Sequence, residues 1–199
     1  MAHPQPDLTA ARLREALLAF LDATQPTCAG IDYRLVGTGA ALLQRVDLPA
    51  GDIDILVRER SELDAFAAAL ASFPCLEPPA WLEHARQYYG NWDVRGVEVG
   101  ISTVEVETDA DTVETLGRGP WTHYAPVPLG PTTVTAVALE LRLITELWRN
   151  RPDRSEPLTA HLAAHGCDLE LIRRGIAGIG LPQDAQDDLI TRLGGAPRP

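Results

Sequence analysis

The chain has 199 residues, of which 45% are hydrophobic, and a formal net charge of −11. This length fits one domain, or a core domain with a helical appendage, and the composition is that of a globular protein. All 17 basic residues are arginine, which excludes a Walker-type phosphate loop because that loop requires lysine. The negative charge argues against a broad nucleic-acid surface. It favours a cationic small molecule or another protein as partner, or serves solubility alone.

Apolar residues at helical spacing predict an amphipathic helix over residues 7–22. Asp7 or Thr9 can cap its beginning, and Gln25-Pro26 is expected to end it. A strand is then predicted over residues 33–36, followed by a Gly-Thr-Gly turn at 37–39 and a short helix over 40–45. This turn is not a dinucleotide-binding fingerprint, because Leu42 stands where Gly or Ala is needed for close helix packing.

The next predicted strand, over residues 52–57, carries two carboxylates on one face. Successive side chains of a strand point to opposite faces, so Asp52 and Asp54 share one side and Ile53 and Ile55 share the buried side. Two neighbouring carboxylates repel each other by roughly 1 kcal/mol or more when partly desolvated. A cation between them relieves this repulsion, and magnesium prefers carboxylate, water and phosphate oxygens. The strand therefore predicts a magnesium site.

The middle of the chain is expected to contain helices and strands. Ser61 and Asp64 resemble a capping box at the start of a helix that stops before Pro74. Pro78-Pro79 is expected to precede a short helix that ends at Gly90. Strong alternation over residues 92–107 predicts one or two strands that turn at Arg95-Gly96.

The last third of the chain is predicted to be mainly helical. Residues 109–131 are rich in Gly, Pro and Thr and are expected to be irregular, with one short strand. A hydrophobic stripe predicts a helix from Leu139 to Asn150, followed by an arginine-rich link of sequence RNRPDR. Shorter helices are predicted around residues 158–164, 168–176 and 182–193. We therefore divide the chain into a first domain of residues 1–135 and a helical C-terminal part of residues 136–199.

The order of these elements and motifs resembles the nucleotidyltransferases of the DNA polymerase beta-like superfamily. The resemblance is to small bacterial members, which include antibiotic nucleotidyltransferases and toxin–antitoxin proteins. Their motif reads here Val36-Gly37-Thr38, thirteen residues, then Asp52-Ile53-Asp54-Ile55, with Thr where Ser is usual. It covers roughly residues 31–150 and implies an α/β (α+β) nucleotidyltransferase fold, with a small mixed sheet flanked by helices.

The resemblance also implies roles for single residues. By position, Gly37 and Thr38 would contact the triphosphate of an NTP, and Asp52 and Asp54 would hold Mg²⁺ or Mn²⁺. Arg58 lies on the same strand face as the two aspartates and is the expected further contact to the triphosphate. In such enzymes two divalent ions clamp the attacking and leaving oxygens during displacement at the α-phosphorus.

In these enzymes a third carboxylate from the next strand completes one metal site and helps to deprotonate the acceptor hydroxyl. Here that position is Gly100. Glu98 lies two residues earlier on the same face, about 6–7 Å away along the strand, and is the expected replacement as catalytic residue and metal ligand. Glu105 is a weaker candidate. The alternative is that Glu98 is an exposed strand residue and the site lacks its base.

Other charged residues are expected to be structural. His161 and His165 are four residues apart but lack the glutamate and the third ligand of a helical zinc site, so we expect them on the surface. Arg149, Arg151 and Arg154 could reach substrate phosphates, but a solvated helix end, where positive charge suits the helix dipole, is favoured.

Together these observations predict metal-dependent transfer of a nucleoside monophosphate from an NTP, such as ATP, to a hydroxyl of a small molecule or a protein. One alternative is a degraded site that binds nucleotide or ligand without turnover, and another is an interaction module of a toxin–antitoxin pair. No apolar run approaches the ~20 residues that span a bilayer, and the N-terminus lacks a secretory signal. The three cysteines are widely spaced. We therefore expect a cytoplasmic protein without a membrane partner.

Overall fold

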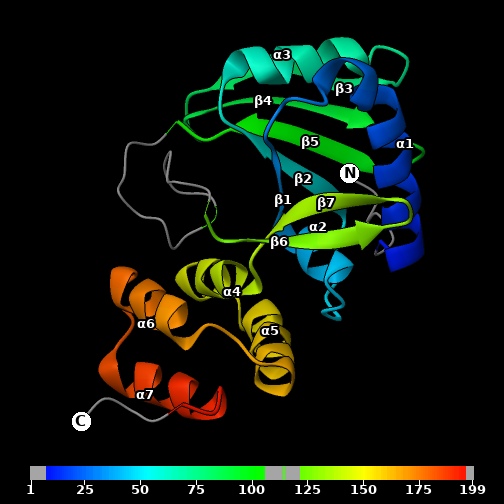
Figure 1. Ribbon diagram of the computed structural model, residues 1–199. Coiled ribbons are helices and arrows are strands. Elements are labelled where there is room, and N and C mark those ends of the chain that lie inside the picture. Colours follow the sequence, from blue (N-terminus) through cyan, green and yellow to red (C-terminus); the bar gives the residue numbers. More distant parts are fainter. Residues whose placement is uncertain (1–7, 106–113, 115–121, 196–199) are drawn as a thin grey trace, which may run out of the picture.

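A mixed sheet of seven strands forms the centre of this computed structural model, which describes residues 8–105, 114 and 122–195. The strands are β1 (Arg34–Val36), β2 (Asp52–Val57), β3 (Cys75–Leu82), β4 (Gln87–Asp93), β5 (Glu98–Thr103), β6 (Tyr124–Leu129) and β7 (Thr132–Val137). They lie in the order β3-β4-β5-β2-β1-β7-β6 (Figure 1). Strand β2 is parallel to β5 and antiparallel to β1. The expected α/β fold class is confirmed.

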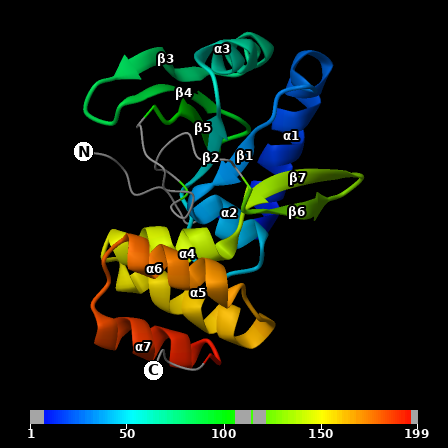
Figure 2. The ribbon, with the colours of Figure 1, turned by 60° about the vertical axis from the view of Figure 1, so that its left-hand side comes forward.

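Helices cover one face of this sheet and gather at one of its ends. They are α1 (Ala10–Cys28), α2 (Gly37–Leu43), α3 (Arg60–Ala69), α4 (Leu139–Trp148), α5 (Pro152–His165), α6 (Leu169–Gly178) and α7 (Gln183–Arg192). Helices α1 and α3 share a buried core with the apolar face of β2 and β5, where Phe20 and Phe66 stack with ring centroids 5.5 Å apart. Helices α4 to α7 lie together at one end of the molecule in both views (Figure 2). The face of β2 that carries Asp52 and Asp54 is therefore not covered by α1 and α3, and it forms part of the site described below.

The C-terminal helices have a second apolar core that also includes residues from the first half of the chain. Leu143, Leu158 and Ile172 are completely buried in it. Ala41 of α2 and Val46 of the following loop belong to the same core. Helix α2 therefore connects the sheet to the C-terminal helices, and the division of the chain at residue 135 stays a prediction. No helix in the described residues is both long enough and apolar enough to cross a membrane.

The N-terminal expectations are confirmed for β1 and β2 and need correction at three helix ends. Helix α1 continues through Pro26 to Cys28, which is buried in the core. Helix α2 begins at Gly37, so the Gly-Thr-Gly segment forms its first turn. Helix α3 is capped by Glu59 and Glu62 instead of Ser61 and Asp64.

The predicted short helix ending at Gly90 is wrong. This segment forms the antiparallel strands β3 and β4. The prolines Pro78 and Pro79 lie in β3, which is an edge strand and needs no hydrogen-bond donors on its outer side. Most of β3 is exposed, so its sequence lacks the apolar pattern of a strand. The turn at Arg95-Gly96 is confirmed, with φ values of 57° and 77° between β4 and β5.

Two further corrections concern the second half of the chain. Residues 124–137 form a two-stranded hairpin, although one short strand was expected within residues 109–131 and none after it. Part of the predicted irregular segment, residues 109–113 and 115–121, lies outside the described residues. The arginine-rich link is partly helical, because α5 already begins at Pro152, and proline suits the first turn of a helix.

Candidate functional site

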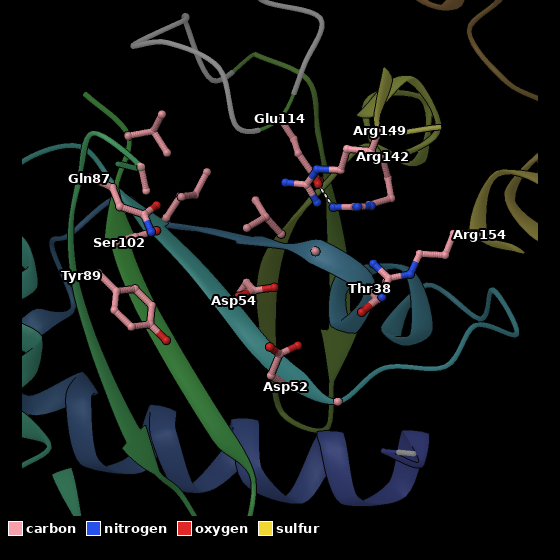
Figure 3. A pocket seen from close by; sticks show the side chains of 16 residues that line it. Thr38, Asp52, Asp54, Gln87, Tyr89, Ser102, Glu114, Arg142, Arg149 and Arg154 are labelled. Carbon is pink, nitrogen blue, oxygen red and sulfur yellow. Dashed lines mark ion pairs between the residues drawn. The ribbon is translucent and has the colours of Figure 1, made fainter. Parts of the chain in front are cut away.

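A cavity of about 590 Å³, here called the first cavity, opens between the sheet and helices α4 and α5 (Figure 3). Strand β2 contributes Asp52 and Asp54, and α2 contributes Gly37 and Thr38. The opposite side is formed by three arginines from α4, its C-terminal end and α5: Arg142, Arg149 and Arg154. The first cavity thus places a pair of acidic side chains opposite a group of basic ones.

Two glycines allow α2 to approach β2 closely at the edge of the first cavity. A Cβ atom at Gly37 would lie 2.2 Å from Oδ2 of Asp54, and its φ of 72° is left-handed. A Cβ atom at Gly39 would lie 2.8 Å from the main-chain oxygen of Asp52. Thr38 lies between these glycines, is nearly buried and lines the cavity. The two glycines are therefore required by the contact between α2 and the aspartate-bearing strand.

The two aspartates share a face of β2, and both have perturbed acidity. Burial raises the pKa of Asp54 to about 7, and the charge of Asp52 adds to this effect. Burial, and then the charge of Glu98, raises the pKa of Asp52. The arginines across the cavity act in the opposite direction on Asp54. Carboxylates forced together in this way favour a cation, and Mg²⁺ is commonly held by one or two carboxylates plus substrate phosphates and water.

Arg149 and Arg151 are exposed, as expected of a solvated helix end, and Arg154 is half-buried. Arg149 and Arg154 line the first cavity, together with Arg142 of α4. Arg151 lies differently, because its guanidinium bonds Asp153 at 2.7 and 2.9 Å. The sequence pattern indicated no role for Arg142. The sequence shows a cluster of arginines after an amphipathic helix. Such a cluster does not indicate which face of the helix meets the sheet.

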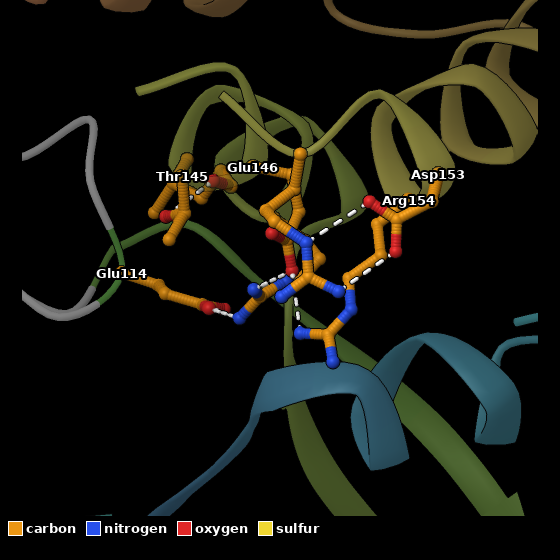
Figure 4. Close-up of polar contacts among 8 residues, drawn as sticks. Glu114, Thr145, Glu146, Asp153 and Arg154 are labelled. Carbon is orange, nitrogen blue, oxygen red and sulfur yellow. Dashed lines mark hydrogen bonds and ion pairs between the residues drawn. The ribbon is translucent and has the colours of Figure 1, made fainter. Parts of the chain in front are cut away.

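A buried ionic cluster holds two of these arginines in place (Figure 4). Glu146 is completely buried and pairs with Arg142 one helical turn away. Glu146 also accepts a hydrogen bond from Arg154 at 3.4 Å. Glu114 pairs with Arg142 from the other side, and burial lowers the pKa of Arg142. Buried charges cost stability when they lack a partner of opposite charge. Because Glu146 pairs with both guanidinium groups, it fixes the positions of Arg142 and Arg154.

Tyr89 covers the position at which a third carboxylate was sought. Gly100 of β5 lies directly beside Asp54 in the parallel pair of strands. A Cβ atom at Gly100 would lie 3.0 Å from Cε2 and 3.1 Å from the hydroxyl oxygen of Tyr89. Burial, followed by the nearby carboxylates, raises the pKa of Tyr89 to about 12. The sequence pattern did not indicate Tyr89, because Tyr89 lies in the segment that was wrongly predicted to be a helix.

Glu98 and Glu105 occupy different environments on and after β5. Glu98 lies beside Asp52 in the strand pairing and accepts a hydrogen bond from Nδ2 of Asn91 at 3.3 Å. Glu105 pairs with Arg60 through two bonds of 2.8 Å. Of these two glutamates, Glu98 is therefore the one placed beside the aspartate pair, although it is not part of the cavity wall formed by the described residues.

Arg58 lies away from the residues that meet at the first cavity. It follows the C-terminal end of β2, and its guanidinium lies 3.4 Å from Oδ2 of Asp32. Asp52 stands at the opposite end of the same strand. The structure thus brings Gly37, Thr38, Asp52 and Asp54 together and leaves Arg58 outside the cavity wall among the described residues.

No protein-family model matches the sequence, and no curated protein matches it either. Solved structures, however, share its fold. A candidate nucleotidyltransferase from Thermotoga maritima is 15% identical with a TM-score of 0.58, over 82% of this chain and 100% of that chain. The antibiotic-resistance factor ANT(2″)-Ia is 14% identical with a TM-score of 0.56, over 90% and 97%. An antigenic nucleotidyltransferase-like protein from Paracoccidioides brasiliensis is 13% identical with a TM-score of 0.55, over 98% and 97%. At such low identities the likeness concerns the fold alone.

Proposed function

We propose that this protein, which has the nucleotidyltransferase fold, transfers a nucleoside monophosphate from an NTP to a hydroxyl group. The observation that carries the proposal is the first cavity, in which Asp52 and Asp54 face three arginines across one space. A cation-bound triphosphate has the matching arrangement of charges, with the cation toward the carboxylates and phosphate oxygens toward the guanidinium groups.

Asp52 and Asp54 would hold the divalent cation, Mg²⁺ or Mn²⁺. The raised pKa of Asp54 supports this assignment, because burial and the charge of Asp52 outweigh the opposing charges of the arginines, and a bound cation would offset both effects. When bound, the cation supplies neutralisation of the phosphate oxygens and of the leaving group. The remaining coordination would come from water and the substrate, as is usual for magnesium.

The phosphates would be bound by the opposite wall of the cavity. Arg149 and Arg154 are the proposed contacts, because both line the cavity and Arg154 is held by Glu146. Thr38 would donate its hydroxyl to a phosphate oxygen, and Gly37 would allow the close approach of the main chain. The position of Arg58 beside Asp32 favours the two cavity arginines over Arg58 for this role.

In the proposed reaction the acceptor hydroxyl oxygen forms a bond to the α-phosphorus. The bond from this phosphorus to the oxygen that bridges the α- and β-phosphates breaks, and pyrophosphate leaves with the bonding electrons. The hydroxyl proton passes to a carboxylate, for which Glu98 beside Asp52 is our candidate. The arginines oppose the negative charge that develops on the leaving group.

The acceptor class is inferred from charge and from one structural neighbour. The net charge of −11 favours a cationic acceptor. ANT(2″)-Ia is described as an antibiotic-resistance factor, which makes a small-molecule acceptor the first class to test, ahead of a protein. Nucleic acid is disfavoured by the same charge.

Calorimetry and thermal unfolding test the binding step. We expect ATP or another NTP to bind in the presence of Mg²⁺ and not in EDTA. Mg²⁺ should also raise the melting temperature by an amount that grows with its concentration, because it binds the native state. The double variant Asp52→Asn with Asp54→Asn should lose both effects while being at least as stable as the metal-free wild type. An equal gain from Mg²⁺ in this variant would place the cation elsewhere and overturn the proposal.

Arginine variants test the orientation of the nucleotide. Arg149→Gln and Arg154→Gln should each weaken NTP binding by about tenfold or more, because each removes a charge-assisted bond. Arg151→Gln is the matched control, since Arg151 pairs with Asp153 instead of lining the cavity. Turnover is then measured as pyrophosphate release in the presence of labelled NTPs and a cell lysate.

A second candidate function is nucleotide binding without turnover. It is favoured by the contact between Tyr89 and Gly100, which leaves no carboxylate beside Asp54 on β5. Magnesium-dependent NTP binding without pyrophosphate release, under any acceptor, would support this candidate over the transferase.

A further inference from the structure

A second cavity of about 590 Å³ shares no lining residue with the first cavity. It is bounded by α1, the C-terminal ends of α2 and α5, the start of α4 and the edge strand β6. Figure 2 shows the β6–β7 hairpin and the end of α5 on the same side of the molecule. We propose that the second cavity binds a small molecule that carries a phosphate ester on an apolar body.

The charges around the second cavity are mostly positive, in contrast to the chain as a whole. Arg14 of α1, Arg45 after α2 and His161 and His165 of α5 all line it. The acidic residue in its described lining is Glu140 of α4, whose carboxylate already accepts a hydrogen bond of 2.9 Å from the main-chain N–H of Asp168. A basic hollow on a protein of net charge −11 concentrates anions locally.

The two histidines are arranged as one polar group at the end of α5. Their rings stack with centroids 4.1 Å apart and an angle of 21° between the planes. Nδ1 of His165 lies 2.8 Å from the main-chain oxygen of His161. A carbonyl oxygen only accepts, so Nδ1 of His165 carries the proton and its Nε2 remains available. Protonation of Nε2 turns it into a donor to an anion.

An anion resolves the repulsion within this histidine pair. The pKa of His161 is lowered first by burial and then by the neighbouring His165. Without a bound anion, a positive charge on His161 is therefore disfavoured. A phosphate dianion against the pair reverses that effect, assisted by Arg14 and Arg45 and opposed by Glu140. Ligand binding is therefore linked to proton uptake and strengthens as pH falls.

The backbone of Arg45 supports a role for its side chain. Arg45 has φ of 71°, a left-handed conformation that glycine adopts without cost and other residues adopt only at an energetic cost. Its main-chain N–H bonds the Leu42 carbonyl oxygen at 3.0 Å and ends the helix. Glycine would end α2 in the same way, so arginine here adds a guanidinium to the lining of the second cavity.

The rest of the lining suits an apolar body attached to the anionic group. The wall includes Leu43, Leu139 and Leu162, which are almost completely buried, and Tyr124, whose ring centroid lies 4.3 Å from Cζ of Arg34. Pro126 and Pro128 of β6 lack main-chain N–H groups, which disfavours addition of another strand at this edge. The volume of about 590 Å³ lies within the range of small-molecule sites.

Proton NMR of the histidine rings tests the proposal, with phenyl phosphate as the ligand. We expect saturable shifts of the His161 and His165 resonances and a rise in the pKa of His161 by about 1. Binding should tighten about threefold from about pH 8 to about pH 6.5, a range in which the ester stays mostly doubly charged. Arg45→Gln and the double variant His161→Ala with His165→Ala should each weaken binding by about tenfold.

Three controls keep this result separate from the first cavity and from non-specific binding. Arg149→Gln with Arg154→Gln should leave the His161 and His165 shifts unchanged. His84 is exposed in the turn between β3 and β4 and does not line the second cavity, so His84→Ala should leave the affinity unchanged. Benzyl alcohol, which has the ring without the phosphate, should not bind. Absence of saturable shifts at His161 and His165, or equal affinity for the Arg45→Gln variant, overturns the proposal. Because the readout is local, failure of the nucleotide site does not affect it.

Discussion

Asp54 links the chemistry of single residues to the stability of the molecule. Burial and the charge of Asp52 raise the pKa of Asp54 from 3.8 to about 7. Between these two values the native protein binds the proton more tightly than the unfolded chain does. The free energy of unfolding of the metal-free protein therefore contains a contribution from Asp54 that is largest below about pH 4 and is lost as pH rises through about 7.

This linkage predicts the behaviour of the variant Asp54→Asn. In EDTA at about pH 8 the variant should be more stable than the wild type by about 4 kcal/mol, because the buried negative charge is removed. The difference should vanish toward about pH 4. Urea denaturation at several pH values measures it. A wild type and variant with parallel pH profiles would show that Asp54 is not perturbed.

Gly37 allows a second prediction at this scale. In Gly37→Ala the new methyl group would meet Oδ2 of Asp54, and alanine would have to adopt a left-handed backbone. We expect a loss of about 2 kcal/mol in the free energy of unfolding, together with weaker Mg²⁺ binding. Gly30→Ala is the matched control, because no atom lies within 4 Å of a Cβ at that position. Equal stability of the two variants would contradict the close approach of α2 to β2.

At the scale of elements, strand β5 presents two possible sites for the base. Glu98 stands beside Asp52, while Gly100 stands beside Asp54 under the ring of Tyr89. If Glu98 accepts the proton, Glu98→Gln should lower the rate of transfer by about 100-fold or more and leave the protein folded. Glu105→Gln is the control, since Glu105 pairs with Arg60. An unchanged rate in Glu98→Gln would remove Glu98 from the mechanism.

The same strand explains why a carboxylate at position 100 needs a second change. A Cβ atom at Gly100 lies 3.0 Å from the Tyr89 ring, so Gly100→Asp alone should displace that ring and reduce stability. Combining Gly100→Asp with Tyr89→Ala removes the contact. Comparison of the two single variants with the double variant measures their coupling.

At the scale of the whole molecule, the first cavity depends on both halves of the chain. The aspartates come from β2, and the arginines come from α4, its C-terminal end and α5. A fragment of residues 1–135 should therefore fail to bind an NTP with Mg²⁺, even where circular dichroism shows a folded sheet. It should also bind hydrophobic dyes, because Ala41 and Val46 lose the second core. Full NTP affinity in this fragment would show that the arginines play no part.

The sequence alone determined those features that depend on near neighbours in the chain. Alternation along a strand places Asp52 and Asp54 on one face, whatever packs around them. The spacing of Gly37-Thr38 and the aspartate pair indicated the fold, and the apolar stripes indicated most of the C-terminal helices. The hairpin β3–β4 was missed because its exposed edge strand carries prolines and no apolar pattern.

Only the tertiary structure decided which distant residues meet the aspartates. Packing of α4 and α5 against α2 turns Arg149 and Arg154 into the first cavity, whereas the register of β1 and β2 leaves Arg58 beside Asp32. The pairing of β4 with β5 brings Tyr89 over Gly100. The physical reason is that helix and strand periodicity describe the face of a residue relative to its own element. What that face contacts depends on how elements far apart in the chain pack together.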